Sequence, residues 1–282
     1  MIRIYPLIFI LLWSSAFITT KPIVDNSDPF AALAFRFFFV ALGFYLFSFY
    51  LNQSLITNKR KIAEAVLSGV LFHGFYLGGV FYSISIGMPV GIAALIVTLQ
   101  PVLTNILSGP ILDEKITTQQ WIGVLLGFTG ASLVLGLDIG SGIPLLGLIA
   151  TIIALLSITI STIWQKKISK NLPLSVSNFY QAFGGCLFHV LIVIFFAEPY
   201  INFNKVFIIA MSHQVLLVSF GAFTILMLLI KKNSASKTVS IFFLIPSTSA
   251  LMAWFFLNEK LTNLDIVGFI VTSVGVYIAT RD

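Results

Sequence analysis

The chain has 282 residues, of which 58% are hydrophobic, 14% are aromatic and only 9% are charged. A soluble domain carries about 25% charged residues, because polar side chains must build the surface that faces water. With 16 basic and 10 acidic residues, this chain has too few charged side chains to form a water-facing surface, so the composition excludes an ordinary soluble enzyme. It predicts a protein embedded in a lipid bilayer, with short loops and no soluble domain.

Apolar runs long enough to cross a bilayer as helices follow one another along the chain. Charged and turn-forming residues separate most of them, and the weakest break, between the third and fourth runs, depends on Gly87 and Pro89. The runs do not alternate as the strands of a membrane barrel would. The sequence therefore predicts ten transmembrane helices, at 4–21, 29–51, 63–86, 89–112, 119–137, 143–165, 174–197, 206–230, 235–257 and 264–280.

The basic residues indicate how these helices are oriented. With the N-terminus inside, twelve of the sixteen Lys and Arg residues fall on the inner side, and three, Lys21, Lys205 and Lys260, fall on the outer side. Because positively charged loops stay in the cytoplasm, we expect both termini to be cytoplasmic. The net charge of +6 follows from this orientation, and no basic face interleaved with aromatics predicts a nucleic-acid partner.

The second half of the chain repeats the first at an offset of 145 residues. The identities at this offset pair Pro101 with Pro246, Glu114 with Glu259, Lys115 with Lys260, Thr117 with Thr262, Gly123 with Gly268 and Gly130 with Gly275. Each half holds five predicted helices, an odd number, so the second half enters the bilayer with opposite polarity. We therefore expect two inverted repeats, residues 1–137 and 138–282, with a binding site near the midplane between them.

The chain resembles a known transporter family in three places. They are the segment Trp13-Ser14-Ser15-Ala16-Phe17 ending at Lys21, the pair Pro29 and Arg36, and the twin segments that follow Pro101 and Pro246. Over essentially the whole chain these are similar to the drug/metabolite transporter (DMT) superfamily, specifically its EamA-type exporters. The resemblance implies a ten-helix carrier that moves small metabolites, commonly amino acids and their derivatives, across a bacterial inner membrane. The halves differ where Gln181 replaces Arg36, which leaves the substrate open.

Arg36 is the only formally charged residue well inside a predicted helix. A charge at that depth costs about 3 kcal/mol on insertion scales, and such residues usually face a cavity or a partner. No Asp or Glu lies deep enough to pair with it. We expect Arg36 to anchor a carboxylate or phosphate of the substrate, since guanidinium binds both in a bidentate manner. The alternative is that its side chain extends to the headgroups or to carbonyls at a helix end.

Proline, polar and aromatic residues supply the other candidates. Pro101 and Pro246 remove helical hydrogen bonds at matching positions, which predicts kinks at the site or its gates, although packing kinks are an alternative. Small polar residues nearby can bind substrate or join helices, and intramembrane aromatics can stack on an apolar substrate. The predicted substrate site comprises Trp13, Ser14, Arg36, His73, Tyr76, Gln100, Asn105, Tyr180, Gln181, Ser247 and Trp254.

Two histidines and two glutamates each have alternative candidate roles. His73 and His189 lie mid-helix and could carry a coupling proton, although neutral histidines hydrogen-bonded between helices are commoner. Glu114 and Glu259, each followed by lysine, end the fourth and ninth helices. We expect them to pair locally or to cap the following helix, and their placement on opposite membrane faces also suits gate-closing contacts.

Motifs for other chemistry are missing from the sequence. It contains no P-loop, no His-Glu-x-x-His, no pair of cysteines and no Gly-x-Ser-x-Gly, so we expect no cofactor, no metal and no enzymatic activity. The favoured function is a secondary-active exporter that works by alternating access, as a monomer or homodimer. The alternatives are an uptake or exchange carrier for nucleotide-like or other anionic metabolites, a channel, and a membrane enzyme or structural subunit.

Overall fold

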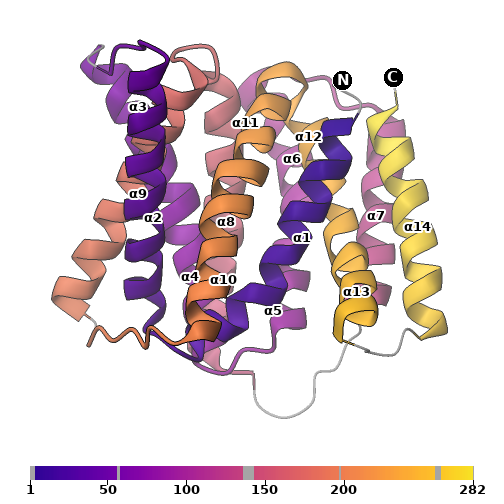
Figure 1. Cartoon of the computed structure of the whole chain (residues 1–282). Coiled ribbons are helices and arrows are strands. Elements are labelled where there is room, and N and C mark those ends of the chain that lie inside the picture. Colours follow the sequence, from indigo (N-terminus) through magenta and orange to yellow (C-terminus); the bar gives the residue numbers. More distant parts are fainter. Residues whose placement is uncertain (1–3, 56–57, 136–142, 197, 258–261, 282) are drawn as a thin grey trace.

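The computed structural model describes residues 4–55, 58–135, 143–196, 198–257 and 262–281. Within these ranges all regular structure is helical, apart from one isolated β-bridge between Ser27 and Ile201. The helical segments, shown in Figure 1, are α1 (Tyr5–Val24), α2 (Pro29–Tyr50), α3 (Lys59–Gly69), η2 (Val70–Tyr76), α4 (Leu77–Ser85), α5 (Val90–Val97), α6 (Gln100–Leu112), α7 (Thr118–Leu135), α8 (Leu145–Ile168), α9 (Leu174–Phe196), α10 (Lys205–His213), η3 (Gln214–Ala222), α11 (Phe223–Lys232), α12 (Ala235–Ser240), η4 (Ile241–Phe243), α13 (Leu244–Leu257) and α14 (Asn263–Thr280).

Nine stretches of the described chain are helical, long and apolar enough to cross a membrane, against ten predicted. They coincide with the predicted spans except the fifth, at 119–137. That span corresponds to α7, an 18-residue helix that lies beside α14 (Figure 1). The expectation of an all-helical polytopic membrane protein is therefore confirmed, whereas the count of ten is not.

Four of the nine stretches are interrupted, and the interruptions come in pairs. The third and eighth predicted spans contain the π-helical segments η2 and η3. The fourth and ninth consist of shorter helices, α5 followed by α6, and α12 followed by the 3₁₀ turn η4 and by α13. Because each pair occupies matching positions in the two halves of the chain, the duplication is visible in backbone geometry as well as in sequence.

Equivalent helices of the two halves pack on each other. The contacts of α7 with α14 and of α2 with α9 are the most extensive in the fold. At the first interface a Cβ built on Gly123 would lie 2.4 Å from the backbone nitrogen of Ala279, and one built on Gly275 would lie 2.4 Å from that of Gly127. Only glycine permits so close an approach. Such mutual packing of equivalent helices is what a two-repeat architecture requires.

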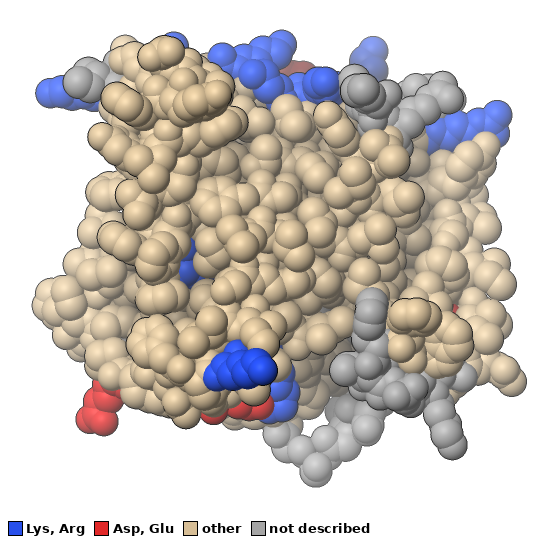
Figure 2. Space-filling model, in the orientation of Figure 1, with Lys and Arg blue, Asp and Glu red and all other residues tan. Residues whose placement is uncertain are grey.

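The surface carries a broad apolar belt between two polar ends. Figure 2 shows Lys and Arg gathered at the end where Figure 1 places both termini. We call this the basic end, and the other the opposite end. Large apolar side chains such as Leu46, Ile209 and Ile270 are exposed on the belt. A surface of this kind is stable against hydrocarbon and not against water, so the belt marks the part that lies in the bilayer.

Candidate functional site

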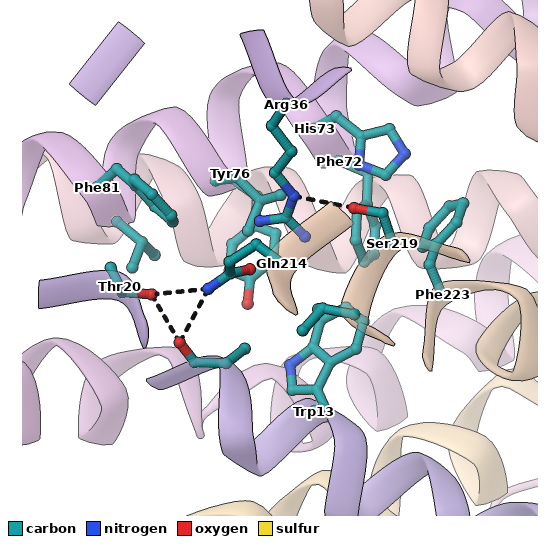
Figure 3. A pocket seen from close by; sticks show the side chains of 14 residues that line it. Trp13, Thr20, Arg36, Phe72, His73, Tyr76, Phe81, Gln214, Ser219 and Phe223 are labelled. Atoms are coloured by element: carbon teal, nitrogen blue, oxygen red, sulfur yellow. Dashed lines mark hydrogen bonds between the residues drawn. The ribbon is translucent and has the colours of Figure 1, made fainter. Parts of the chain in front are cut away.

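A small cavity of about 40 Å³ lies between helices of the two halves, and we call it the Arg36 pocket. Helices α1, α2 and α4 and the segment η2 contribute from the first half, while η3 and α11 contribute from the second. Its lining, shown in Figure 3, consists of Trp13, Ala16, Thr20, Arg36, Phe72, His73, Tyr76, Leu77, Val80, Phe81, Gln214, Val218, Ser219 and Phe223.

The Arg36 pocket extends from the middle of the bundle toward the end away from the basic end. Helix α1 starts at the basic end and reaches the pocket at Thr20, four residues before its last residue. Helix α2 starts at the opposite end with Pro29 and reaches the pocket at Arg36. Phe81 likewise precedes the end of α4 by four residues. The cavity is therefore displaced toward one face of the membrane.

The two π-helical segments form facing walls of the pocket. Adding the repeat offset to η2 gives residues 215–221, which lie within η3. The segment η2 supplies Phe72, His73 and Tyr76, and η3 supplies Gln214 and Ser219 among others. Single π turns are rare and occur frequently at functional sites, because they rotate side chains out of the regular helical register. Both halves thus use the same backbone irregularity to line one cavity.

Arg36 is the charged group of this pocket. Its side chain is 3% exposed, and its Nε donates a 2.9 Å hydrogen bond to Oγ of Ser219. Its Cζ lies 5.3 Å from the centre of the Phe37 ring. No residue in the described part of the chain provides a hydrogen-bond acceptor or a carboxylate to its two terminal nitrogens, which point into the pocket in Figure 3. A buried guanidinium without an anionic partner is a binding group for one.

Aromatic rings form the apolar wall below Arg36. The Phe72 ring makes edge contacts with Trp13 and Tyr76, at centroid distances of 6.1 and 5.4 Å, and lies 5.2 Å from the Phe223 ring. Such mutual packing holds the rings in place without a ligand. The pocket therefore combines one cation with a preformed aromatic surface.

Gln214 adds a polar group to the same wall. Its Nε2 donates to the carbonyl of Ala16 and to Oγ1 of Thr19, at 3.0 and 2.9 Å, which ties η3 to α1. Its Oε1 is buried and has no hydrogen-bond partner among the described residues. An unpaired buried acceptor costs free energy, so a ligand donor that reached this atom would offset that cost.

The histidines differ in their contacts. His73 lines the pocket, where its ring packs 4.4 Å from the Phe37 ring and 4.5 Å from the Phe223 ring. Neither of its ring nitrogens has a hydrogen-bond partner in the part of the chain that the structure describes. His189 lies behind it and donates from Nε2 to the carbonyl of His73, at 2.9 Å. Of the two candidate proton carriers, only His73 reaches the cavity.

Four of the predicted site residues come together in the pocket, namely Trp13, Arg36, His73 and Tyr76. Ser14, beside Trp13 on α1, faces α13 instead and donates to the carbonyl of Ile245 at 3.2 Å. Trp254 is half exposed on α13. Ser14, the sequence neighbour of Trp13, thus joins α1 to α13 and does not line the pocket.

The other predicted residues lie in the core at a distance from this lining. Gln100 donates to Oγ1 of Thr162 at 3.0 Å, and Ser247 is buried outside the pocket. Tyr180 donates to the carbonyl of Leu55 at 2.6 Å, on the loop at the basic end. Gln181 accepts from Nε2 of Gln165 at 2.9 Å.

Gln181 is the repeat equivalent of Arg36, and it lines a separate small cavity of about 20 Å³ with Gln165 and Lys231. Its amide is fully engaged by neighbouring side chains, because Oε1 also accepts from Ser68 and Nε2 donates to Ser177. The two halves therefore differ in kind at this position. One holds an unpaired cation, and the other holds a neutral amide satisfied by the protein.

The two prolines lie beside helix breaks. Pro101 is the second residue of α6, directly after the break that separates α6 from α5. Pro246 is the third residue of α13, directly after the 3₁₀ turn η4. Neither proline lines the Arg36 pocket. The prolines therefore lie at the breaks of the two interrupted spans and do not contribute side chains to the pocket.

Sequence reasoning missed the second half's entire contribution to the pocket, which is Gln214, Val218, Ser219 and Phe223. The signal that could have found them is the repeat itself. Shifting His73 and Tyr76 by 145 residues leads to the middle of η3, so the candidates in the third span indicate the matching stretch of the eighth.

A group of contacts holds α11 and α12 at the basic end. The carboxylate of Glu114 accepts hydrogen bonds from the backbone nitrogens of Ala235 and Ser236, at 2.7 and 3.3 Å. Nζ of Lys166 donates to the carbonyls of Ile230 and Asn233, at 3.0 and 2.5 Å. Each charge faces the helix end of opposite partial charge. We call these four bonds the α11–α12 clamp.

Glu114 caps a different helix from the one that follows it in sequence. The next helix, α7, is capped by its own residues, since Oγ1 of Thr117 accepts from the backbone of Gln120 and Oε1 of Gln120 accepts from that of Thr117. Glu114 reaches across to α12 instead. Ser236 on α12 also donates to Oδ1 of Asn105, which places that predicted site residue under the clamp. Glu259 lies outside the described residues.

The described residues contain no group of three or more His, Cys, Asp or Glu that could hold a metal ion. The lining of the Arg36 pocket offers one cation, neutral polar groups and aromatic rings.

Comparison with known proteins agrees with this architecture. A solved crystal structure superposes with a TM-score of 0.82 over 99% of this chain and 97% of that chain, at 17% identity. The uncharacterized transporter YvbV of Bacillus subtilis is 28% identical over 76% of this chain and 69% of its own. A probable amino-acid metabolite efflux pump of Escherichia coli is 21% identical over 96% of this chain and 92% of its own.

The model of the EamA-like transporter family matches twice, at residues 3–136 and 145–281. The two matches together span nearly the whole chain. They follow the same duplication that the helix breaks and the α7–α14 interface display. The resemblance drawn from the sequence is confirmed, and the chain belongs to the EamA-like transporter family.

Proposed function

We propose that this transporter is a secondary-active exporter of small carboxylate-bearing metabolites, such as amino acids or their derivatives, and that it binds them in the Arg36 pocket. The observation that carries the proposal is a buried guanidinium without an anionic partner, inside an aromatic cavity between the two repeats. The name of the Escherichia coli relative, a probable amino-acid metabolite efflux pump, supports export of this class.

The proposed mechanism is alternating access. The positive-inside rule assigns the basic end to the cytoplasm of a bacterium, with both termini there. The Arg36 pocket lies toward the opposite end, while the α11–α12 clamp closes the basic end. This arrangement corresponds to a state closed at the basic end, and exchange of the two inverted repeats would produce one closed at the opposite end.

His73 is the proposed proton site if transport is coupled to the proton gradient. Its ring lines the pocket and its nitrogens are unpartnered among the described side chains, so protonation there would change the charge that a bound anion meets. We expect His73→Gln to remove any dependence of export on the proton gradient. Export by His73→Gln that still stops when an ionophore collapses the gradient would assign coupling elsewhere.

The test is flux in proteoliposomes that contain the purified full chain, with a panel of labelled amino acids, N-acetylated amino acids, aromatic acids and nucleotides. We expect saturable efflux and counterflow for at least one carboxylate. Arg36→Ala removes a buried charged partner, which costs about 2–5 kcal/mol in binding and abolishes measurable flux. Arg60→Ala is the matched control, because Arg60 is exposed at the basic end and pairs with Glu64.

Two results would contradict the proposal. Unchanged flux in Arg36→Ala would show that the pocket cation is not the anchor. Flux that neither saturates nor shows counterflow would assign the protein to the channels. A preference for nucleotides over every carboxylate would support the carrier mechanism and replace the substrate class.

A further inference from the structure

The charge inside the Arg36 pocket restricts the substrate further, and this step rests on the function proposed above. Arg36 is the only formally charged group among the fourteen lining residues, none of which is Asp or Glu. The carboxylate of Asp28, at the start of α2, is occupied as an N-cap and accepts from the backbone nitrogen of Ala31 at 2.8 Å. The empty pocket therefore holds one uncompensated positive charge when His73 is neutral.

We infer that the pocket selects a carboxylate of net charge −1 that carries a neutral hydrogen-bond donor, such as an N-acylated amino acid, over a zwitterionic amino acid. A single carboxylate neutralises Arg36 and leaves no further charge in a poorly hydrated cavity. A zwitterion brings a second cation, whose charge no carboxylate in the lining balances.

The unpaired polar atoms of the lining fit the monoanion. An ammonium group has three N–H donors, whereas an amide N–H or a hydroxyl has one. The buried acceptors without a partner in the described lining are Oε1 of Gln214 and one ring nitrogen of neutral His73. Oε1 of Gln214 is satisfied by one neutral donor. Two neutral acceptors neither complete the hydrogen bonds of an ammonium nor balance its charge.

The remaining wall fits an apolar body next to the carboxylate. Trp13, Phe72, Tyr76, Phe81 and Phe223 supply ring surface on several sides of the cavity. Ser219 already accepts from Nε of Arg36, which fixes the guanidinium so that its terminal nitrogens remain for the ligand. The assigned ligand thus has three parts, a carboxylate at Arg36, a neutral donor at Gln214 and an apolar group on the rings.

The experiment compares ligands that share one side chain and differ only in the charges of their amino and carboxyl groups. The probes are N-acetyl-L-phenylalanine, L-phenylalanine, L-phenylalanine amide and N-acetyl-L-phenylalanine amide, and the same four forms of leucine. Binding to the detergent-purified full chain is measured by calorimetry and by thermal shift, since a ligand stabilises the state that it binds. We expect the N-acetyl acid to bind at least about tenfold more tightly than the zwitterion, a difference of about 1.4 kcal/mol.

Gln214→Glu replaces a neutral amide with a carboxylate of nearly the same shape and should reverse the ligand preference. A carboxylate in this position would pair with Arg36 and supply the missing counter-charge, so we expect this variant to lose the N-acetyl acid and to gain affinity for the zwitterion. Arg36→Gln is expected to bind no form above the level of the neutral N-acetyl amide. Arg60→Gln, on the exposed surface, serves as the control and should retain the wild-type preference.

The outcomes separate this inference from the proposed function. Zwitterion binding that equals or exceeds that of the N-acetyl acid, and that is lost in Arg36→Gln, overturns the charge preference and leaves Arg36 as the anchor. Binding of neither carboxylate form in either series, or binding that is unchanged in Arg36→Gln, contradicts the anchor itself.

Discussion

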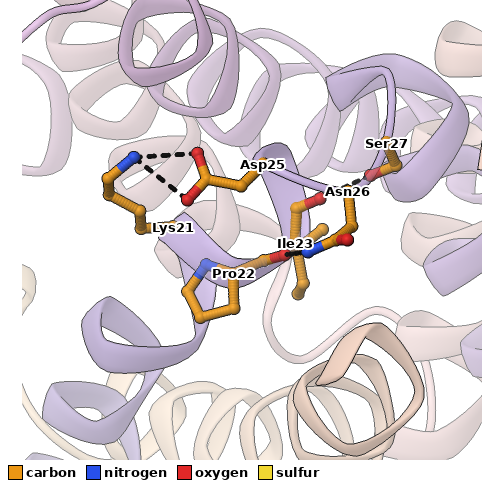
Figure 4. Close-up of polar contacts among 6 residues, drawn as sticks. All are labelled: Lys21, Pro22, Ile23, Asp25, Asn26 and Ser27. Atoms are coloured by element: carbon orange, nitrogen blue, oxygen red, sulfur yellow. Dashed lines mark hydrogen bonds and ion pairs between the residues drawn. The ribbon is translucent and has the colours of Figure 1, made fainter. Parts of the chain in front are cut away.

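Two connections in equivalent positions of the repeat, one at each end of the bundle, are held in different ways. The link from α11 to α12 is clamped by Glu114 and Lys166. Its equivalent, the link from α4 to α5, has no corresponding contact among the described residues, and Glu259, the repeat equivalent of Glu114, lies outside them. Lys21, the repeat equivalent of Lys166, pairs with Asp25 at 2.8 Å on the exposed surface (Figure 4). The N-terminus of α5 has no side-chain cap among the described residues.

The difference between these links is one of conformation more than of composition. Lys21 and Lys166 occupy the same repeat position, so the lysine needed for a second clamp is present in the chain. The pocket lies toward the end whose link is unclamped. In the proposed cycle the clamp holds one end shut while the other end admits substrate, and the two ends exchange roles.

The largest expected effect on this comparison comes from Glu114→Ala. It leaves the backbone nitrogens of Ala235 and Ser236 without their charged acceptor, which costs the clamped state about 2–3 kcal/mol. Ser240→Cys, in a Cys186→Ser background, reports on this region because Ser240 is buried on α12. We expect a membrane-impermeant thiol reagent added at the basic end to react roughly 30- to 100-fold faster.

The control for this change is Glu64→Ala, because Glu64 lies at the same end and does not contact α12. It should leave the reaction rate at Ser240→Cys unchanged. Equal acceleration by both variants would mean that general loosening, and not loss of the clamp, exposes α12.

A smaller effect is expected for Lys166→Ala. This change removes donors to the carbonyls of Ile230 and Asn233, which can turn in part to water, so the cost is about 1–2 kcal/mol. The same labelling assay should show an acceleration of about tenfold. Lys170→Ala changes an exposed lysine just beyond the end of α8 and should have no effect. A larger effect for Lys166→Ala than for Glu114→Ala would reverse our ranking of the two halves of the clamp.

The smallest effect is expected for Lys21→Ala. The pair with Asp25 is exposed, and such pairs contribute less than about 1 kcal/mol. The labelling rate at Ser240→Cys and the melting temperature should therefore stay close to those of the parent. Turnover in proteoliposomes is the informative measurement, because a second clamp made by Lys21 would act only in the other state. A full turnover rate in Lys21→Ala would exclude that role.

Sequence reasoning found the fold and part of the pocket because those features leave local signals. Apolar length, loop charge and a gapless repeat predict the membrane helices and their inversion, and a lone arginine within a span indicates the pocket. Trp13 and Tyr76 were found because Trp and Tyr are much less frequent than Phe in this chain. Ser219 and Gln214 did not, because small polar residues on helices that bind a ligand look the same in sequence as those that join helices.

Contacts between distant segments explain the other differences. Gln100 and Asn105 lie beside Pro101, as predicted, yet the break between α5 and α6 directs them to α8 and α12. Glu114 meets α12 across 121 residues of sequence. Local capping rules favoured α7, and only the packing of the two repeats brings the N-terminus of α12 within reach.

The most direct test of alternating access follows the two ends together. In the Cys186→Ser background, Thr20→Cys reports on the Arg36 pocket and Ser240→Cys reports on the clamped end. Reagent is added at the opposite end for the first and at the basic end for the second. We predict that Glu114→Ala slows labelling at Thr20→Cys while it accelerates labelling at Ser240→Cys. Acceleration at both positions, or a change at only one, would contradict a transporter whose two ends open in turn.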